Sequence, residues 1–383
     1  MGSADTLSFV SNDAPTIGVE LELMLVDPAT QDLAATAVEI ESRTRTAGMA
    51  DCVKLEITQS MIEINSSVHA GVAPLQEELH DIAPRLSSIA AGCGTRIAGG
   101  GTHPFHRWQE RRISPTARFH ELASRYGYLS KQFTIFGQHI HVGCGNGDDA
   151  VRAIQVLGRF IPQFIALSAC SPFHRGVDTS FDSCRLNMVA AFPLSGRMPP
   201  VDRWRDFEAF YQRLVAIGVV SSLKDFYWDI RPKPAYGTLE IRVPDTPLDV
   251  ETAADLAAYA QLLVVWSRTL EVPRWLDDFV YRHNRYQAAR FGFEGSVIIS
   301  GLGERRSVRD DILATVPHLR PLAQPYGAVE SLDRVAARAE ASENGARWLR
   351  RQHEDLGDLP AVVDRLCTRW TEQVATPRGT DVA

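Results

Sequence analysis

Two glutamates interrupt an otherwise apolar segment near the N-terminus. In IGVELELMLVD, residues 17–27, Glu20 and Glu22 alternate with apolar side chains. Successive side chains of a strand point to opposite faces, so this pattern places both carboxylates on one face, about 6.5–7 Å apart. At an effective dielectric constant of about 20, two such charges repel by about 2.5 kcal/mol where water is largely excluded. A positive group is therefore expected nearby, unless this face is simply solvated.

Three further segments place polar side chains on an apolar strand. KLEITQSMIEINSSV carries Glu56 and Glu63, FTIFGQHIHVGC carries His139 and His141, and GTLEIRVPD carries Glu240 and Arg242. The first pair is seven residues apart and has opposite parity on a straight strand, so a bend or bulge near Gln59 and Ser60 would be needed to bring both to one site. A polar outer face of the sheet would explain any one of these segments. Four segments that each place acids or imidazoles on one strand face favour a shared site.

Five carboxylates and an imidazole, without a thiolate, form an oxygen-rich ligand set. This set suits Mg²⁺ or Mn²⁺ better than zinc. Several such ions are what the chemistry of nucleoside triphosphates requires, because they bridge phosphate oxygens and neutralise their charge. The chain has no G-x-x-x-x-G-K-[ST] motif, which excludes a P-loop. Metals and arginines are then expected to bind the phosphates.

Arginines are therefore the second group of candidates, because a guanidinium binds a carboxylate or phosphate through two hydrogen bonds. Arg242 shares a strand face with Glu240. The other candidates lie in two motifs, SPFHRGVDTSFDSCRLNM and RHNRYQAARFG: Arg175, Arg185, Arg285 and Arg290.

Two other functions fit the same residues. A zinc hydrolase would use His139 and His141, with His103 or His106 of THPFH and one acid. It would leave the remaining glutamates unexplained. A metal- and nucleotide-binding protein without turnover is the second alternative.

The elements that position these residues predict an α+β fold. Alternation in the strands indicates a largely antiparallel sheet with one polar face. Strands are predicted at 16–26, 53–67, 94–99, 132–144, 225–230 and 237–243, and helices at 74–91, 115–129, 148–170, 203–217, 251–271 and 277–291. Beyond residue 301 only amphipathic helices are expected. We predict a catalytic domain over 12–300, with the C-terminal helices of 301–375 packed on the same domain.

Composition narrows the function further. The 383 residues are 45% hydrophobic and carry a net charge of −7, without a Lys/Arg-rich run, which argues against a nucleic-acid partner. The N-terminus lacks the pattern of a signal peptide, and no stretch approaches the roughly 18 apolar residues of a membrane span. The six cysteines are scattered, as expected of reduced thiols. We expect a cytoplasmic protein with small-molecule substrates.

Six blocks together resemble the bacterial type 2 glutamate-cysteine ligase, or carboxylate-amine ligase, family. They are IGVELELMLVD, KLEITQSMIEINSSV, FGQHIHVGC, SPFHRGVDTSFDSCR, FYWDIRPKPAYGTLEIRVPDTP and NRYQAARFG, in order over residues 16–295. The resemblance implies a glutamine-synthetase-like sheet flanked by helices, with ATP and Mg²⁺ on its concave face. It also suggests a homodimer.

The resemblance also implies roles for single residues. The metal ligands would be Glu20, Glu22, Glu56, Glu63, His139 and Glu240. Arg242 would contact the amino-acid substrate or its phosphate and act in catalysis with Glu240. His141 would be a further substrate contact. From guanidinium chemistry rather than from the resemblance, we expect substrate contacts from Arg175 and Arg185 and cofactor contacts from Arg285 and Arg290. We expect one metal between Glu20, His139 and Glu240, and another between Glu22, Glu56 and Glu63.

The implied reaction has two steps. The side-chain carboxylate of glutamate attacks the γ-phosphate of ATP, giving an acyl phosphate and ADP. The amine of cysteine, or a similar amine, then displaces phosphate. No residue set in the sequence demands a thiol-bearing amine, so the acceptor stays open.

Overall fold

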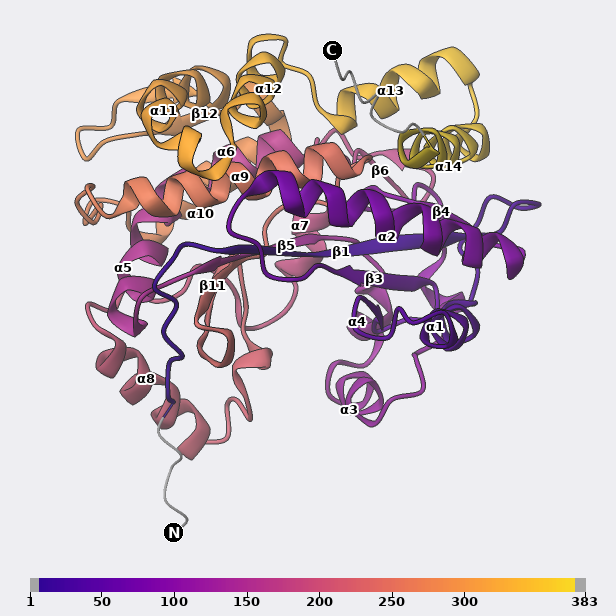
Figure 1. Ribbon diagram of the computed structural model, residues 1–383, viewed down its shortest axis with the longest axis horizontal. Helices are drawn as coiled ribbons and strands as arrows, with labels where there is room; N and C mark the ends of the chain where they lie inside the picture. The colour runs from indigo at the N-terminus through magenta and orange to yellow at the C-terminus, as the bar shows by residue number, and fades with distance from the viewer. Residues whose placement is uncertain (1–6, 376–383) are drawn as a thin grey trace.

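The central feature of the computed structural model, which describes residues 7–375, is a seven-stranded sheet (Figure 1). Its strand order is β10-β11-β5-β1-β3-β2, with β4 also paired to β1, and every pair is antiparallel. The strands are β1 (Ile17–Val26), β2 (Val53–Leu55), β3 (Met61–Asn65), β4 (Arg96–Ala98), β5 (Gln138–Gly143), β10 (Ile230–Lys233) and β11 (Thr238–Ile241). This confirms the predicted α+β class and antiparallel sheet.

The apolar face of the sheet is covered by two long helices. Val19, Leu21 and Leu23 are almost completely buried, and their face packs against α2 (Val72–Gly92) and α9 (Val250–Ser267). α9 begins at an N-cap, where the Asp249 carboxylate accepts a hydrogen bond from the Thr252 amide. Its apolar residues then leave nearly the whole helix buried.

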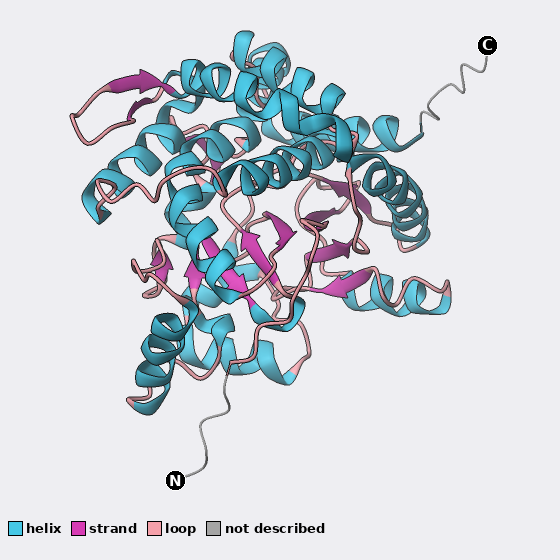
Figure 2. Ribbon diagram, turned by 60° about the vertical axis from the view of Figure 1, so that its left-hand side comes forward, coloured by secondary structure: helices cyan, strands magenta, loops and turns pink. Residues whose placement is uncertain are grey.

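The opposite face of the sheet carries the glutamates and histidines. α1 (Ala37–Thr46), α3 (Ala117–Tyr126), α4 (Tyr128–Gln132) and α8 (Trp204–Ala216) lie on this side in Figure 1, below the sheet and spread toward its two ends. Figure 2 shows the strands in the middle of the molecule with helices on both sides.

Most of the remaining helices form the upper layer and its edges. They are α5 (Gly147–Leu157), α6 (Ile161–Ser168), α10 (Asp278–Phe291), α11 (Val308–Ala323), α12 (Val329–Glu340), α13 (Gly345–Leu356) and α14 (Leu359–Ala375). The short α7 (Arg185–Val189) instead lines a cavity with Glu22 and His139 on the polar side of the sheet. The C-terminal helices contact the sheet-bearing part directly. Arg334 and Arg338 of α12 both bind the buried Asp255 carboxylate of α9, and α14 lies against β4 and α2.

The segment predicted as one bulged strand over 53–67 is two strands. β2 and β3 pair with each other, Lys54 opposite Glu63, and residues 56–60 connect them. This connection is held by another segment: Thr58 bridges Ile113, and the Gln59 side chain donates to the Ile113 carbonyl at 3.0 Å. The bend expected near Gln59 and Ser60 is therefore present, as a chain reversal between two strands rather than a bulge within one.

Other predicted elements are shorter or broken. The helix predicted over 115–129 divides at Gly127, whose φ of 56° lies in the left-handed region that favours glycine. The strand predicted over 132–144 begins only at Gln138. The prediction of no strand beyond residue 301 was also wrong, because β12 (Ser296–Ile298) pairs with β13 (Arg305–Ser307) in a small hairpin.

One segment, Gly147–Ser168, is long and apolar enough to cross a membrane by length and composition. In the structure 89% of its most apolar window is buried inside the protein, as in the core helix of a globular domain. The expectation that no stretch approaches this threshold was therefore too strong.

All six cysteines are free, as expected. Four of them are buried: Cys144, Cys170, Cys184 and Cys367. Burial raises the pKa of the Cys144, Cys184 and Cys367 thiols to about 12, so none of these three is a ready nucleophile.

Candidate active site

Strand register brings the polar residues of four segments together on one face. Across β1 and β5, Glu20 lies opposite His139, and across β1 and β3, Glu22 lies opposite Glu63. Across β5 and β11, His141 lies opposite Glu240. We refer to these six residues, Glu20, Glu22, Glu63, His139, His141 and Glu240, as the acid–imidazole cluster.

Glu20 contacts both histidines of the cluster. Its Oε2 lies 2.8 Å from His139 Nδ1, and its Oε1 lies 3.3 Å from His141 Nε2. Burial alone would raise the pKa of Glu20, but hydrogen bonds from the two imidazoles hold it well below its usual range. Burial, with the nearby charge of Arg242, lowers the pKa of His139 to about 4. His139 is therefore neutral at pH 7 and available as a metal ligand.

The protonation of His139 follows from these contacts. A neutral imidazole bound to Glu20 through Nδ1 carries its proton on that nitrogen, so Nε2 keeps its lone pair. Nε2 lies 3.9 Å from Glu22 Oε1. A carboxylate that orients a histidine in this way is the usual support of a histidine metal ligand. The arrangement thus directs Nε2 toward Glu22 and Glu63.

Glu22 and Glu63 are buried acids, and neither forms an ion pair with a lysine or arginine among residues 7–375. The backbone N–H of Gly137 donates to Glu22 Oε2 at 2.6 Å, and Asn65 donates to Glu63 Oε1 at 2.7 Å. Burial, then the charge of Glu56, raises the pKa of Glu22 to about 8. Burial and three neighbouring carboxylates raise the pKa of Glu63 well above its usual range. Ionising both acids would crowd negative charge here, and a bound cation would balance it.

Glu240, in contrast, is fully buried and fully paired. Arg231 of β10 donates to its two oxygens, from Nε at 2.8 Å and from a terminal nitrogen at 3.2 Å. Arg242 also donates to Glu240 Oε1. Burial opposes ionisation, but Arg231 and then Arg242 hold the pKa of Glu240 well below its usual range.

Arg231 was missed at the level of sequence. It lies directly opposite Glu240 across β10 and β11. The signal that could have revealed it is its place in DIRPKPAYGTLEI, where a reversal at Gly237 pairs the flanking residues.

Two groups of ligand atoms lie close enough to share a metal ion. Glu20, His139 and Glu240 form one, and Glu22, Glu63 and His139 form the other, with all ligand atoms of each group within 4.8 Å of one another. The first group is as expected from the sequence. In the second, His139 replaces Glu56. Carboxylate oxygens and a neutral imidazole fit a hard divalent cation.

Glu56 borders the cluster without entering either group. Its Oε2 accepts a hydrogen bond from the adjacent Ile57 amide at 3.1 Å. Its charge contributes to the raised pKa of both Glu22 and Glu63, so it lies near them.

The predicted arginines divide into two sets. Arg185 lines a small cavity beside Glu22, His139 and Arg242. Arg285 reaches the same cavity wall indirectly, because its Nε donates to Asp229 at 2.9 Å. Arg175 and Arg290 lie away from this cavity.

Arg175 is exposed on the turn between β6 (Phe173–His174) and β7 (Val177–Asp178), where it lines a pocket with His106. Arg290 donates to the Ser180 carbonyl and lies over the Phe181 ring. The structure therefore does not bring these two arginines to the acid–imidazole cluster.

His103 and His106 form a separate group. His103 Nε2 lies 2.9 Å from the Gln31 carbonyl oxygen, and its ring packs 6.1 Å from the His106 ring, which in turn lies 6.3 Å from His174. Neither imidazole contacts His139 or His141. The zinc site that would combine these residues with the pair on β5 is not assembled.

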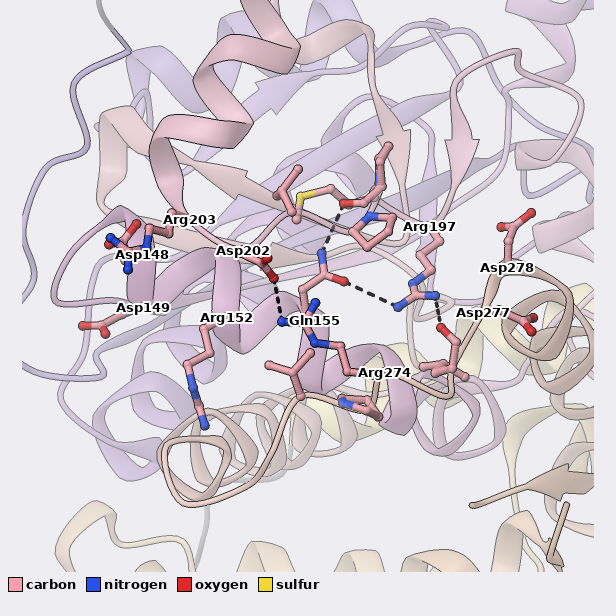
Figure 3. Close-up of a pocket in the computed structure, with 17 residues that line it drawn as sticks. Asp148, Asp149, Arg152, Gln155, Arg197, Asp202, Arg203, Arg274, Asp277 and Asp278 are labelled. Atoms are coloured by element: carbon pink, nitrogen blue, oxygen red, sulfur yellow. Dashed lines mark hydrogen bonds and ion pairs between the residues drawn. The ribbon is translucent and has the colours of Figure 1, made fainter. Parts of the chain in front are cut away.

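A wide groove of about 1010 Å³ lies outside the acid–imidazole cluster (Figure 3). It is lined by α5 and by the segments around residues 197–203 and 272–278. Its charged groups are largely paired with one another or with the backbone: Arg274 binds Asp202 at 2.7 Å, and Arg152 donates to the Ser267 carbonyl at 2.6 Å. Volume alone does not make it the reactive centre.

Comparisons with known proteins agree with this geometry. The model of a family described as glutamate-cysteine ligase family 2 matches residues 16–368. A protein of Bordetella petrii named "Putative glutamate--cysteine ligase 2" is 48% identical over 369 residues, which cover 96% of this chain and 88% of that protein. A protein of the same name from Methylibium petroleiphilum is 46% identical, with coverage of 95% and 99%.

Two solved structures share the fold. A glutamate-cysteine ligase from Francisella tularensis, in complex with AMP, superposes with a TM-score of 0.72 at 12% identity, covering 97% of this chain and 91% of that one. A bifunctional glutathione synthetase from Pasteurella multocida gives a TM-score of 0.69 at 13% identity, covering 94% of this chain and 52% of that one. With its sheet, its acid–imidazole cluster and a family match over most of its length, the chain belongs to glutamate-cysteine ligase family 2.

Proposed function

We propose that the protein is an ATP- and Mg²⁺-dependent ligase that joins the side-chain carboxylate of glutamate to the amine of cysteine or a similar amine. Its family supports a carboxylate-amine ligase. The observation that carries the proposal is the acid–imidazole cluster, whose acids Glu22 and Glu63 lie beside the paired Glu240 and Arg242. The similar Francisella enzyme was solved with AMP, which supports ATP as the nucleotide.

Of the two metal-ligand groups, the one formed by Glu22, Glu63 and His139 Nε2 would hold a metal ion, because His139 Nδ1 carries the proton bound by Glu20. Glu20 and Glu240 would offer carboxylate oxygens to a second ion. Mg²⁺ held at these residues would supply the positive charge that neutralises phosphate oxygens. The protein's own contribution is position: Glu20 orients His139, and the Gly137 amide holds Glu22. These contacts fix the ligands before substrate arrives, so little reorganisation is required during reaction.

Arg242 would act on the transferring group. A glutamate carboxylate oxygen forms a bond to the γ-phosphorus of ATP while the bond to ADP breaks. The acceptor amine then forms the C–N bond while the C–O bond to phosphate breaks. Arg242 lies beside the cluster, held at Glu240, and a guanidinium there stabilises the negative charge that develops on phosphate oxygens. No protein nucleophile is required.

An ADP-release assay over carboxylate and amine pairs tests the proposal, beginning with glutamate and cysteine and with mass spectrometry of the product. ADP release should require Mg²⁺ and a carboxylate substrate. Glu20→Gln and Glu240→Gln should each abolish it. The control is Glu39→Gln on the exposed face of α1, where Glu39 forms a surface ion pair with Arg43. ADP release that persists in both cluster variants would overturn the assignment.

A further inference from the structure

Asp229, between β9 (Tyr227–Trp228) and β10, is a buried carboxylate bound through one oxygen. Its side chain and backbone together are only 2% exposed. Tyr281 donates to Oδ2 at 2.8 Å, and Arg285 Nε donates to the same oxygen at 2.9 Å. Both of these hydrogen bonds, from residues within the described range 7–375, end on the same oxygen. The carboxylate is therefore fixed in place and keeps one oxygen for a ligand.

The backbone of Asp229 is tied to the catalytic strands. Its N–H donates to the Gly196 carbonyl at 2.7 Å, and its carbonyl accepts from the Arg242 N–H at 2.8 Å. The position of Asp229 relative to Arg242 is thus set by the sheet rather than by a mobile loop. A group bound at Asp229 would keep a defined place beside the reacting centre.

The cavity that Asp229 lines is small and enclosed. Its volume is about 20 Å³, a little more than the roughly 10–15 Å³ that one water needs, and an ammonium group is of similar size. Glu22, His139 and Arg242 border it from the acid–imidazole cluster. The remaining walls are mostly apolar: Phe133, Ile135, Leu186, Val189, Tyr227 and Trp228.

A second unused polar group faces this region. Arg185 lines the same cavity and is 4% exposed, and its Nε is a buried donor without a partner among the described residues. Its other nitrogens donate to the carbonyls of Val243 and Arg242 at 3.2 and 3.3 Å. Buried polar groups are rarely left unpaired, so the buried Arg185 Nε, in a cavity that the Asp229 carboxylate also lines, indicates a polar ligand.

We propose that Asp229 binds the ammonium group of the amine acceptor and takes up one of its protons, which leaves the neutral amine nitrogen with the lone pair that attacks the acyl phosphate. This rests on the proposed ligase function. Tyr281 and Arg285 both bind Oδ2, so Oδ1 of the same carboxylate can accept a hydrogen bond from a cation. A metal ion is disfavoured because Asp229 belongs to neither metal-ligand group.

The location favours the acceptor over the carboxylate substrate. An acyl phosphate is hydrolysed by water, so the amine must reach it where water is excluded. The apolar walls around Asp229 provide that exclusion, directly beside Glu22 and His139. The neighbouring Arg185 Nε would donate to an oxygen of the same acceptor.

The test is Asp229→Asn, which keeps the shape and an oxygen for Tyr281 and Arg285 but removes the charge. We expect the KM of the acceptor amine to rise by about 10- to 100-fold, the range of one charge-assisted hydrogen bond. The KM values of ATP and of the carboxylate should change by less than about threefold, because they do not use this group. Asp278→Asn, at an exposed ion pair of α10, is the matched control.

Hydroxylamine provides the second readout. It is small and uncharged at neutral pH, and it converts an acyl phosphate to a hydroxamate. Asp229→Asn should retain hydroxamate formation with the carboxylate and ATP while losing amide formation at low amine concentration. That result would also show that the variant is folded.

Three results would overturn the assignment. A rise in the KM of the carboxylate instead of the amine would place the other substrate at Asp229. An equal loss of hydroxamate and amide would make Asp229 a structural residue. Absence of hydroxamate in the unmodified enzyme, with every carboxylate tried, would contradict the proposed ligase function itself and the ammonium site with it.

Discussion

Arg231 donates two hydrogen bonds to the carboxylate of Glu240 on the neighbouring strand, from Nε to Oε2 at 2.8 Å and from a terminal nitrogen to Oε1 at 3.2 Å. Two carbonyls of the preceding segment hold the same guanidinium, that of Phe226 at 3.1 Å and that of Leu223 at 3.4 Å. Since Glu240 has no exposed surface, its charge depends on Arg231 and Arg242.

Arg231→Gln should therefore destabilise the protein and slow the reaction. Removing one partner of a buried ion pair costs about 3–5 kcal/mol, and the remaining contact of Glu240 with Arg242 favours the lower end, about 3 kcal/mol. Urea unfolding measures this change. ADP release should fall by about 100-fold, because Arg242 must then neutralise Glu240 alone.

Two further variants separate stability from activity. The double variant Arg231→Gln with Glu240→Gln removes both charges and should recover more than half of the lost stability without recovering ADP release. Arg282→Gln breaks an exposed ion pair with Asp278 and should change stability by less than about 0.5 kcal/mol. A double variant no more stable than Arg231→Gln would show that the pair is not the source of the loss.

The metal-ligand groups predict which acids control Mg²⁺ affinity. Glu63→Gln removes a carboxylate from the group of Glu22, Glu63 and His139, so the Mg²⁺ concentration for half-maximal activity should rise by about tenfold or more. The rise in melting temperature caused by Mg²⁺ should shrink in parallel. Glu78→Gln, at an acid that binds Ser67 and His69 instead, should leave both values unchanged. Equal effects of the two substitutions would argue against a metal at Glu63.

Much of this site followed from strand periodicity alone. Parity on a strand identified Glu20 with Glu22 and Glu240 with Arg242, because alternation is a local property. The approach of Glu56 to Glu63 was predicted through a bend or bulge, and a reversal between two strands produces it, although Glu56 enters neither metal-ligand group. That reversal depends on contacts with residues 112–114, which are distant in sequence.

The positions of the arginine side chains were harder to predict, because the tertiary fold determines which groups a long side chain contacts. Arg175 and Arg185 are ten residues apart in one motif, yet a tight hairpin turns the first outward and α7 buries the second. Arg231 and Asp229 lie in a segment interrupted by Pro232, which weakens its strand pattern. Their importance appears only when β10 is paired with β11.

Gly137 should not tolerate a side chain, because Arg185 lies against its backbone. A Cβ at this position would lie 1.9 Å from a terminal nitrogen of Arg185. Gly137→Ala should displace that guanidinium and cost about 1–3 kcal/mol of unfolding free energy, the usual range for overpacking. The hydrogen bond from the residue 137 amide to Glu22 uses only backbone and can persist.

Steady-state kinetics distinguish displacement of the Arg185 guanidinium from a general loss of folded protein. Gly137→Ala should raise the KM of an amino-acid substrate while its Mg²⁺ requirement stays within about twofold. Gly92→Ala, at the C-terminal end of α2, is the control, since its Cβ would meet only the flexible Arg43 side chain at 3.4 Å. If the KM of each amino-acid substrate is unchanged in Gly137→Ala, Arg185 does not contribute to substrate binding.

Stability in the absence of metal should depend on pH in the direction set by Glu22. The pKa of Glu22 is raised from its ordinary value of 4.5 to about 8 in the folded protein. Between these values the folded state holds a proton that the unfolded state has lost, so the free energy of unfolding falls as pH rises. His139, with its pKa lowered from 6.5 to about 4, acts in the opposite direction, but only below pH 6.5.

The clearest window is therefore pH 6.5 to 8. Over that interval Glu22 should cost the metal-free protein about 1.5 kcal/mol, measured by chemical unfolding in EDTA. Mg²⁺ should add more stability at pH 8 than at pH 6.5, because it competes with the proton for the same carboxylates. Glu22→Gln should flatten the dependence. Stability of the unmodified metal-free protein that rises from pH 6.5 to 8 would contradict a protonated Glu22.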